Sequence, residues 1–280
     1  MAELIISKED FLKFREFFYR KTGIQFDDSK RYFVDRRLIE RVEATDSGSF
    51  RNYFMMLRFE ASGDEIQTLT NLMTVNETYF FREEYQFQCL VNSILPELVK
   101  RKTDKSPIRI WSMPSSSGEE PYSIAMYLLE YWAGINQWDV EIISSDIDTK
   151  ILNQARRGSY SQRSVGNLPK SLLTKYFTPS GAEYQICEDL RQAVEFTRVN
   201  LMNAADVRGY RGFDVIFCRN LLIYFDDLSR RQAADTFYDA LHPGGFLCLG
   251  HSESMSRISS LYKARKFPDS VVYQKPMEAR

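Results

Sequence analysis

The spacing of hydrophobic residues divides the chain into two parts. After Ser7, a helix cap with Asp10 three residues later, apolar residues fall at helical intervals, at positions 11, 12, 14, 17 and 18, until Gly23. The same reasoning predicts three further helices, over residues 28–44, 50–58 and 64–73. We therefore expect residues 1–75 to form an all-α N-terminal domain.

Residues 76–107 are expected to connect the two parts. A long helix is predicted from Glu83 to about Lys102, and Pro96 within it predicts a kink or a break. The polar stretch KRKTDKSP, residues 100–107, marks the start of the second domain.

From residue 108 onward, apolar runs alternate with amphipathic segments. Strands are predicted at IRIWS, DVEIISSD, VEFTRV, FDVIFC, FLCLG and SVVYQ, and helices over residues 119–132, 148–156 and 226–241. Several of these strands are continuously apolar, as in a parallel sheet buried on both faces. Residues 108–280 are thus predicted to form an α/β domain with a doubly wound, mainly parallel sheet. The alternation is interrupted at about residues 158–195, where we expect a small inserted subdomain with a β-hairpin.

Composition narrows the classes of function. The 280 residues include 37 basic and 38 acidic ones, for a net charge of −1, so nothing indicates a nucleic-acid partner or membrane insertion. The N-terminal residues lack a basic start followed by an apolar core, so no signal peptide is expected. Four widely spaced cysteines and two histidines argue against a metal site and are consistent with reduced thiols in the cytoplasm.

The segment after the first predicted strand, WSMPSSSGEEPYSIAM, has the position of a nucleotide-binding loop. Gly118 is its only glycine, and Glu119 and Glu120 open the following helix. Anions at that end disfavour a bound pyrophosphate and favour a cationic group such as an ammonium. Ordinary helix capping by Ser and Glu explains the same residues equally well.

Polar residues also follow the other predicted strands. Asp146 ends the second strand about 28 residues after Gly118, where an acidic side chain binds ribose hydroxyls in dinucleotide folds. Asn200–Leu201, Asn220–Leu221 and Tyr224 follow later strands. Ligands of open parallel sheets bind at this edge. Together these residues favour a nucleoside site without a phosphate cradle, for which S-adenosylmethionine fits better than NAD. Each residue alone is also consistent with an ordinary strand end.

The connecting segment TVNETYFFRE places Asn76, Thr78 and Arg82 among three aromatic residues. Such a segment can cover a cofactor pocket, or it can be an interdomain hinge whose aromatic rings pack against both domains.

Six motifs in order resemble the CheR family of chemotaxis receptor methyltransferases: NETYFFRE, WSMPSSSGEEPYSIAM, SSDIDTKIL, VNL, FDVIFCRNLLIYFD and LHPGGFLCLGHSES. The resemblance runs nearly end to end and implies a class I, Rossmann-like methyltransferase domain. It implies a cytoplasmic, monomeric enzyme that transfers methyl groups from S-adenosylmethionine to glutamates of the chemoreceptor cytoplasmic helical bundle. The products are glutamate methyl esters and S-adenosylhomocysteine. A regulatory protein of unknown identity stays open as a second partner.

The resemblance also implies site residues. Cofactor contacts are expected from Asn76, Thr78, Arg82, one glutamate of the GEE motif, Asp146, Asn200, Leu201, Asn220 and Leu221. Both Glu119 and Glu120 are candidates for that glutamate, and Glu120 is preferred. Arg82 and Tyr224 match residues that the family associates with activity.

The chain departs from the family pattern in two places. Met113-Pro114-Ser115 replaces smaller residues in the first loop. The stretch TPSGAEYQICEDL has a single glycine, whereas some members carry a glycine-rich loop there that binds a pentapeptide at the receptor C-terminus. We expect this enzyme to be independent of the pentapeptide.

A basic face is predicted on the second helix. Lys30, Arg37 and Arg41 fall within about 40° of one another on a helical projection. With the family resemblance, this spacing predicts a receptor-facing surface, and the alternative is an ordinary solvated face.

Three other functions compete with this prediction. One is a methyltransferase of small molecules or nucleic acids, and another is a non-enzymatic module that binds S-adenosylmethionine as a ligand. The third, an NAD dehydrogenase, is disfavoured by the missing G-x-G-x-x-G motif and by the acidic helix start.

Overall fold

The computed structural model describes residues 5–268 and 270–277. Its N-terminal part consists of α1 (Lys8–Thr22), the short η1 (Asp28–Lys30), α2 (Arg31–Ala44), α3 (Phe50–Phe59) and α4 (Asp64–Met73). Ser7 caps α1 by accepting a hydrogen bond from the Asp10 N–H, and Gly23 ends it in the left-handed conformation with φ 73°. The four α-helices enclose a core of their own, which confirms the predicted all-α domain.

A continuous helical segment leads from this domain to the sheet. It comprises α5 (Tyr85–Cys89), the π-helical turn η2 (Leu90–Ile94) and α6 (Leu95–Arg101). The expected break at Pro96 does not occur. Pro96 lies in the first turn of α6, where a missing N–H is tolerated, and the helix widens just before it, with the Leu95 N–H donating to the Leu90 carbonyl.

The second part is built on a seven-stranded sheet with the order β6-β2-β1-β7-β8-β10-β9. Five strands are parallel: β1 (Ile108–Ser112), β2 (Val140–Asp146), β6 (Val194–Arg198), β7 (Phe213–Cys218) and β8 (Leu241–Leu249). The strands β10 (Val271–Gln274) and β9 (Lys263–Lys266) extend the sheet in antiparallel order. The prediction of a doubly wound, mainly parallel sheet is confirmed.

Both faces of the sheet are covered, which explains the continuously apolar strands. Ile110 and Val215 belong to one core cluster, together with side chains of α5, α6, α7 (Glu119–Tyr131) and α8 (Thr149–Arg157). Their neighbours Trp111 and Ile216 belong to a second cluster, with side chains of α13 (Asp227–Ala240).

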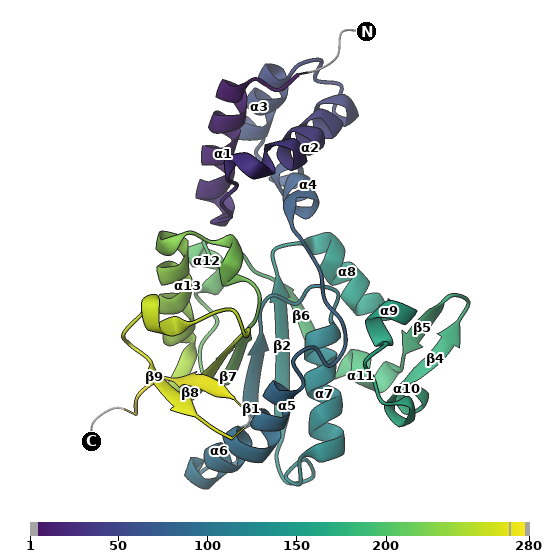
Figure 1. Ribbon diagram of the computed structural model, residues 1–280, viewed down its shortest axis with the longest axis vertical. Helices are drawn as coiled ribbons and strands as arrows, with labels where there is room; N and C mark the ends of the chain where they lie inside the picture. Colours follow the sequence, from purple (N-terminus) through teal and green to yellow (C-terminus); the bar gives the residue numbers. More distant parts are fainter. Residues whose placement is uncertain (1–4, 269, 278–280) are drawn as a thin grey trace.

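A small subdomain is inserted between α8 and β6, as predicted, and projects beside α7 (Figure 1). It contains β3 (Ser159–Ser161), α9 (Gln162–Val165), α10 (Lys170–Tyr176), β4 (Phe177–Ser180), β5 (Glu183–Ile186) and α11 (Glu188–Gln192). Its three strands have the order β3-β5-β4. Ser180 pairs with Glu183, so the hairpin turn consists of Gly181 and Ala182 alone.

The helical domain lies above the sheet, with α1 and α4 closest to it (Figure 1). Near α1, Ile24 forms a β-bridge with Phe225, which follows β7. Near α4, the Gln67 side-chain amide donates to the Ile147 carbonyl after β2 at 2.8 Å. The helical domain therefore rests on loops that leave the carboxyl ends of the parallel strands.

Within the described residues, no helix combines the length and apolar character needed to span a membrane.

Candidate functional site

A cavity of about 410 Å³ lies where the helical domain meets the carboxyl edge of the sheet. Its walls come from the loops after β1, β2, β6 and β7, from the connecting segment, and from the residues around η1. Of the predicted cofactor and catalytic residues, those that line it are Asn76, Thr78, Arg82, Glu120, Asp146, Asn200, Leu201, Asn220, Leu221 and Tyr224. Glu119 does not line the cavity.

The loop between β1 and α7 forms one wall of the cavity. The Met113–Pro114 peptide bond is cis, and the Ser115 N–H donates to the Ser145 carbonyl at 2.7 Å. The hydroxyl groups of Ser115 and Ser116 are buried and have no hydrogen-bond partner within the protein. Since buried polar groups are nearly always satisfied, these two hydroxyls indicate a polar ligand.

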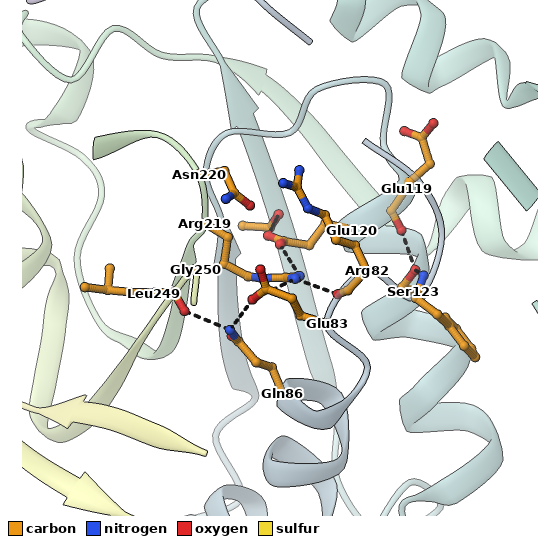
Figure 2. Close-up of polar contacts among 12 residues, drawn as sticks. Arg82, Glu83, Gln86, Glu119, Glu120, Ser123, Arg219, Asn220, Leu249 and Gly250 are labelled. Carbon is orange, nitrogen blue, oxygen red and sulfur yellow. Dashed lines mark hydrogen bonds and ion pairs between the residues drawn. The ribbon is translucent and has the colours of Figure 1, made fainter. Parts of the chain in front are cut away.

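Glu119 and Glu120 point in different directions (Figure 2). The Glu119 carboxylate accepts hydrogen bonds from Ser117 and from Ser164 in α9, at 2.6 and 2.7 Å. Glu120 turns toward the cavity and accepts a hydrogen bond from Ser112 at 2.9 Å. Burial raises the pKa of both carboxyls. Glu119 thus joins the loop to the inserted subdomain, which corrects its expected place among the cofactor contacts.

Glu120 belongs to a buried ion cluster with Arg219 and Glu83 (Figure 2). The guanidinium of Arg219, only 5% exposed, donates to Glu120 at 2.8 Å and lies 3.3 Å from the Glu83 carboxylate. It also donates to the Arg82 carbonyl. Gln86 donates to the Glu83 carboxylate and to the Leu249 carbonyl. The cluster therefore fixes the connecting segment to the sheet edge. No sequence pattern indicated this role for Arg219, because its partners come from distant segments.

Asp146 closes the cavity at the end of β2 and is 3% exposed. One carboxylate oxygen accepts the Ser116 N–H at 2.8 Å and the other accepts the Asp148 N–H at 3.0 Å. Burial raises the pKa of Asp146 to about 6. Asp148 caps α8 and also accepts from the Asn76 side chain at 2.9 Å. Asn76 is therefore held at the cavity wall.

The loop after β6 links the cavity to the helical domain. The Asn200 side-chain oxygen accepts the Met202 N–H at 3.0 Å, and its amide donates to the Lys21 carbonyl at the end of α1 at 2.6 Å. Leu201 is buried and presents an apolar surface to the cavity.

The loop after β7 carries Tyr224, which is 37% exposed and lines the cavity. The Tyr224 carbonyl accepts the Gln25 N–H at 3.2 Å, and Tyr19 donates to Asp226 at 2.9 Å. The Arg82 guanidinium in the connecting segment also lines the cavity, donates to the Glu77 carbonyl at 3.0 Å and lies over the Tyr79 ring. Arg82 and Tyr224 thus reach the same cavity from two different segments of the chain.

The three basic residues predicted on the second helix do not share an exposed face. Lys30 is exposed and lines the cavity. The Arg37 guanidinium lies 3.4 Å from the centre of the Phe33 ring, and Arg41 forms two hydrogen bonds, of 2.9 and 2.7 Å, with the buried Glu65. Arg37 and Arg41 thus have partners within the helical domain, and Arg41 pairs with Glu65 because α2 packs against α4. A receptor-facing role of the basic residues stays a prediction.

We expect Arg41→Ala to lower the free energy of unfolding by about 2 kcal/mol, because the buried Glu65 carboxylate then has no cation and keeps only the hydrogen bond from the Tyr53 hydroxyl. Urea unfolding measures this loss. Lys30→Ala is the matched control and is expected to change stability by less than about 0.5 kcal/mol. Equal stabilities of the two variants would contradict the structural role given to Arg41.

The described part of the chain contains no group of three or more His, Cys, Asp or Glu side chains placed to hold a metal ion.

Comparisons with known proteins agree with this arrangement. Residues 9–74 match the CheR methyltransferase all-alpha domain, and residues 76–271 match the CheR methyltransferase SAM binding domain. Chemotaxis protein methyltransferase 2 of Vibrio cholerae is 56% identical over 281 residues, covering 100% of this chain and 97% of that protein. Chemotaxis protein methyltransferase 2 of Pseudomonas aeruginosa is 38% identical over 267 residues, covering 94% and 92%. The chemotaxis protein methyltransferase of Borreliella burgdorferi is 35% identical over 254 residues, covering 89% of each chain. This chain therefore belongs to the CheR methyltransferase family.

Proposed function

We propose that this chain is an S-adenosylmethionine-dependent protein-glutamate O-methyltransferase that modifies chemoreceptors during chemotaxis. The observation that carries the proposal is a cavity at the carboxyl edge of the sheet with Asp146 and Glu120 on its walls. In this proposal residues 1–75 form the N-terminal helical domain, residues 76–107 the linker and connecting helix, and residues 108–280 the methyltransferase domain with its insertion at about 158–195. Family membership and relatives named as methyltransferases disfavour a non-enzymatic binding module.

The residues present fit S-adenosylmethionine. Ser115 and Ser116 offer unpartnered hydroxyls, and Glu120 provides a carboxylate for an ammonium group. Asp146 suits ribose hydroxyls. The proposed cofactor residues are Asn76, Thr78, Arg82, Glu120, Asp146, Asn200, Leu201, Asn220 and Leu221, and Glu119 supports their loop.

When bound, S-adenosylmethionine supplies a methyl group that is activated by the positive charge on its sulfur. The acceptor glutamate has an ordinary pKa of about 4.3 and is already ionised at neutral pH, so the enzyme needs no strong general base. The connecting segment and the helical domain contribute walls to the cavity, and in this proposal the bound cofactor and acceptor displace water from it. Exclusion of water helps because the acceptor carboxylate loses its charge as it reacts. Arg82 and Tyr224, which both line the cavity, are proposed to orient this carboxylate.

We expect Arg82→Ala and Tyr224→Phe each to lower kcat with receptor fragments by about 10- to 100-fold, because misplaced reactants lose rate steeply. Steady-state assays with saturating cofactor measure this effect. Tyr131→Phe is the control, since Tyr131 lies at the far end of α7, outside the cavity. Near-normal turnover of both site variants would refute their assignment.

The acceptor is proposed to be the helical bundle of chemoreceptor cytoplasmic domains, which places the enzyme in the cytoplasm. Lys30, exposed and at the cavity wall, is the one member of the predicted basic face that we propose to contact it. We further propose that the enzyme acts as a monomer, and a regulatory protein of unknown identity stays open as a second partner.

We also propose that methylation does not depend on a receptor C-terminal pentapeptide. The β4–β5 hairpin has a turn of only two residues, Gly181 and Ala182, so it offers no extended loop on which a peptide could lie. Calorimetric titration with such a pentapeptide is expected to show no low-micromolar binding. Saturable heat in that range would overturn this expectation.

A further inference from the structure

The carboxylate of Glu253 lies in a concave group of backbone N–H donors. One oxygen accepts from Asn220 at 2.8 Å and from Gly250 at 2.9 Å, and the other accepts from Leu222 at 2.8 Å. Successive backbone N–H groups of this kind form an anion-binding site. Here the anion is supplied by the protein itself, from the segment after β8.

The backbone around Glu253 is shaped for this contact. Asn220 has φ 58°, a left-handed conformation that Asn tolerates better than most residues. At Gly250, a Cβ atom would lie 2.9 Å from a Glu253 carboxylate oxygen and 3.1 Å from the Asn220 nitrogen. On the other side of the loop, Arg230 of α13 donates to the Leu222 carbonyl at 2.9 Å. The loop is therefore clamped between Glu253 and α13.

The clamped loop supplies one wall of the cavity. Asn220, Leu221, Ile223 and Tyr224 all line the cavity, whereas Glu253 does not. Glu253 contributes no wall of the cavity itself, and its hydrogen bonds act on the cavity through the loop. We propose that Glu253 is a positioning residue: its carboxylate sets the conformation of residues 220–224 and thereby places both Asn220–Leu221 and Tyr224. The inference rests on the proposed function for the role of Tyr224.

Glu253→Gln tests this proposal with little change in size. Both carboxylate oxygens accept backbone N–H groups, so an amide must turn its NH₂ toward at least one of these donors. We expect the affinity for S-adenosylhomocysteine to fall by about tenfold, as for a buried donor left unsatisfied. We expect kcat to fall by at least as much. Calorimetry needs no acceptor, so this readout is independent of whether receptors are the substrate.

A double-mutant cycle separates positioning from a purely structural role. If Glu253 acts through Tyr224, the kcat of Glu253→Gln combined with Tyr224→Phe should equal that of the slower single variant within about threefold. If the losses in kcat of the two single variants multiply in the double variant, Glu253 does not act through Tyr224 and the proposal is overturned. Gly250→Ala is the second variant, because its methyl group displaces the same carboxylate, and it should reproduce both defects if Glu253→Gln does not fold.

Glu97→Gln is the matched control. Glu97 of α6 is also a partly buried carboxylate, which accepts hydrogen bonds from Arg265 and Gln274 outside the cavity. It should keep normal affinity and turnover. Normal affinity and kcat in folded Glu253→Gln and Gly250→Ala would overturn the proposal.

Discussion

Asp146→Asn is expected to lower the affinity for S-adenosylhomocysteine by about 100-fold. Both oxygens of the buried carboxylate already accept a backbone N–H, from Ser116 and Asp148, and the carboxylate lines the cavity. An amide has one accepting oxygen only, so it cannot serve two backbone donors and two ribose hydroxyls. Hydrogen bonds to a charged group contribute about 1.5–3 kcal/mol each, so the loss of one or two accounts for the effect.

Isothermal titration at pH 8 measures this effect. Asp139→Asn is the matched control, because Asp139 is exposed just before β2, away from the carboxyl edge. An affinity of Asp146→Asn within threefold of the unmodified protein would show that Asp146 does not bind the cofactor.

The pKa of Asp146 gives the same interaction a pH dependence. Burial raises this pKa to about 6, above its ordinary value of 3.8. The folded ligand-free protein therefore binds a proton at Asp146 more tightly than the unfolded chain does. This adds to the free energy of unfolding below about pH 4, and the contribution is lost as pH rises through 6. Cofactor affinity depends on pH in the opposite direction, because the cofactor binds the ionised carboxylate. Affinity should increase as pH rises through 6 and level off above pH 7, and this increase should be absent in Asp146→Asn.

Arg219→Met is expected to lower the free energy of unfolding by about 3–5 kcal/mol. Arg219 is the cation between the carboxylates of Glu83 and Glu120, which are themselves largely buried. Its removal leaves the two carboxylates close together with no guanidinium between them, because the exposed His251 contacts Glu83 alone. It also frees the Arg82 carbonyl. Adding Glu120→Gln should recover part of the loss, because one of the two uncompensated charges is then gone.

Urea unfolding compares this variant with Arg20→Met. Arg20 pairs with Glu16 on the exposed surface of α1, so its replacement should have almost no effect on stability. If Arg219→Met cost less than about 1 kcal/mol, the ion cluster would not be the element that fixes the connecting segment.

The fold could be predicted largely from the spacing of apolar residues. The strands at Ile108 and Phe213 are apolar on both faces and α13 is amphipathic, so the parallel sheet was recognisable. The strand β9, with the sequence KARK, was missed because a charged edge strand has no apolar pattern. The π-helical turn before Pro96 was missed as well, because the pattern indicates where a proline disturbs a helix but not how the backbone adjusts.

The candidate site was predicted less completely, because its geometry depends on contacts between distant segments. Glu119 and Glu120 are neighbours in sequence, and only the packing of α9 shows that Glu119 faces Ser164. The helical spacing of Arg41 with Lys30 and Arg37 predicts an exposed basic face on α2, yet its partner Glu65 comes from α4. Arg219 follows β7 directly, but Glu83 and Glu120, which give it a role, come from two other segments.

The most direct test of the proposed function is methylation of receptor fragments with S-adenosylmethionine labelled at the methyl group. A panel of chemoreceptor cytoplasmic fragments is incubated with the enzyme, and the labelled fragments are then treated with base. We expect label on glutamates of at least one fragment and its release as methanol, with little label from Arg82→Ala. A protein that binds S-adenosylhomocysteine but labels none of the fragments, or labels them only in a base-stable form, would contradict the assignment as a glutamate methyltransferase.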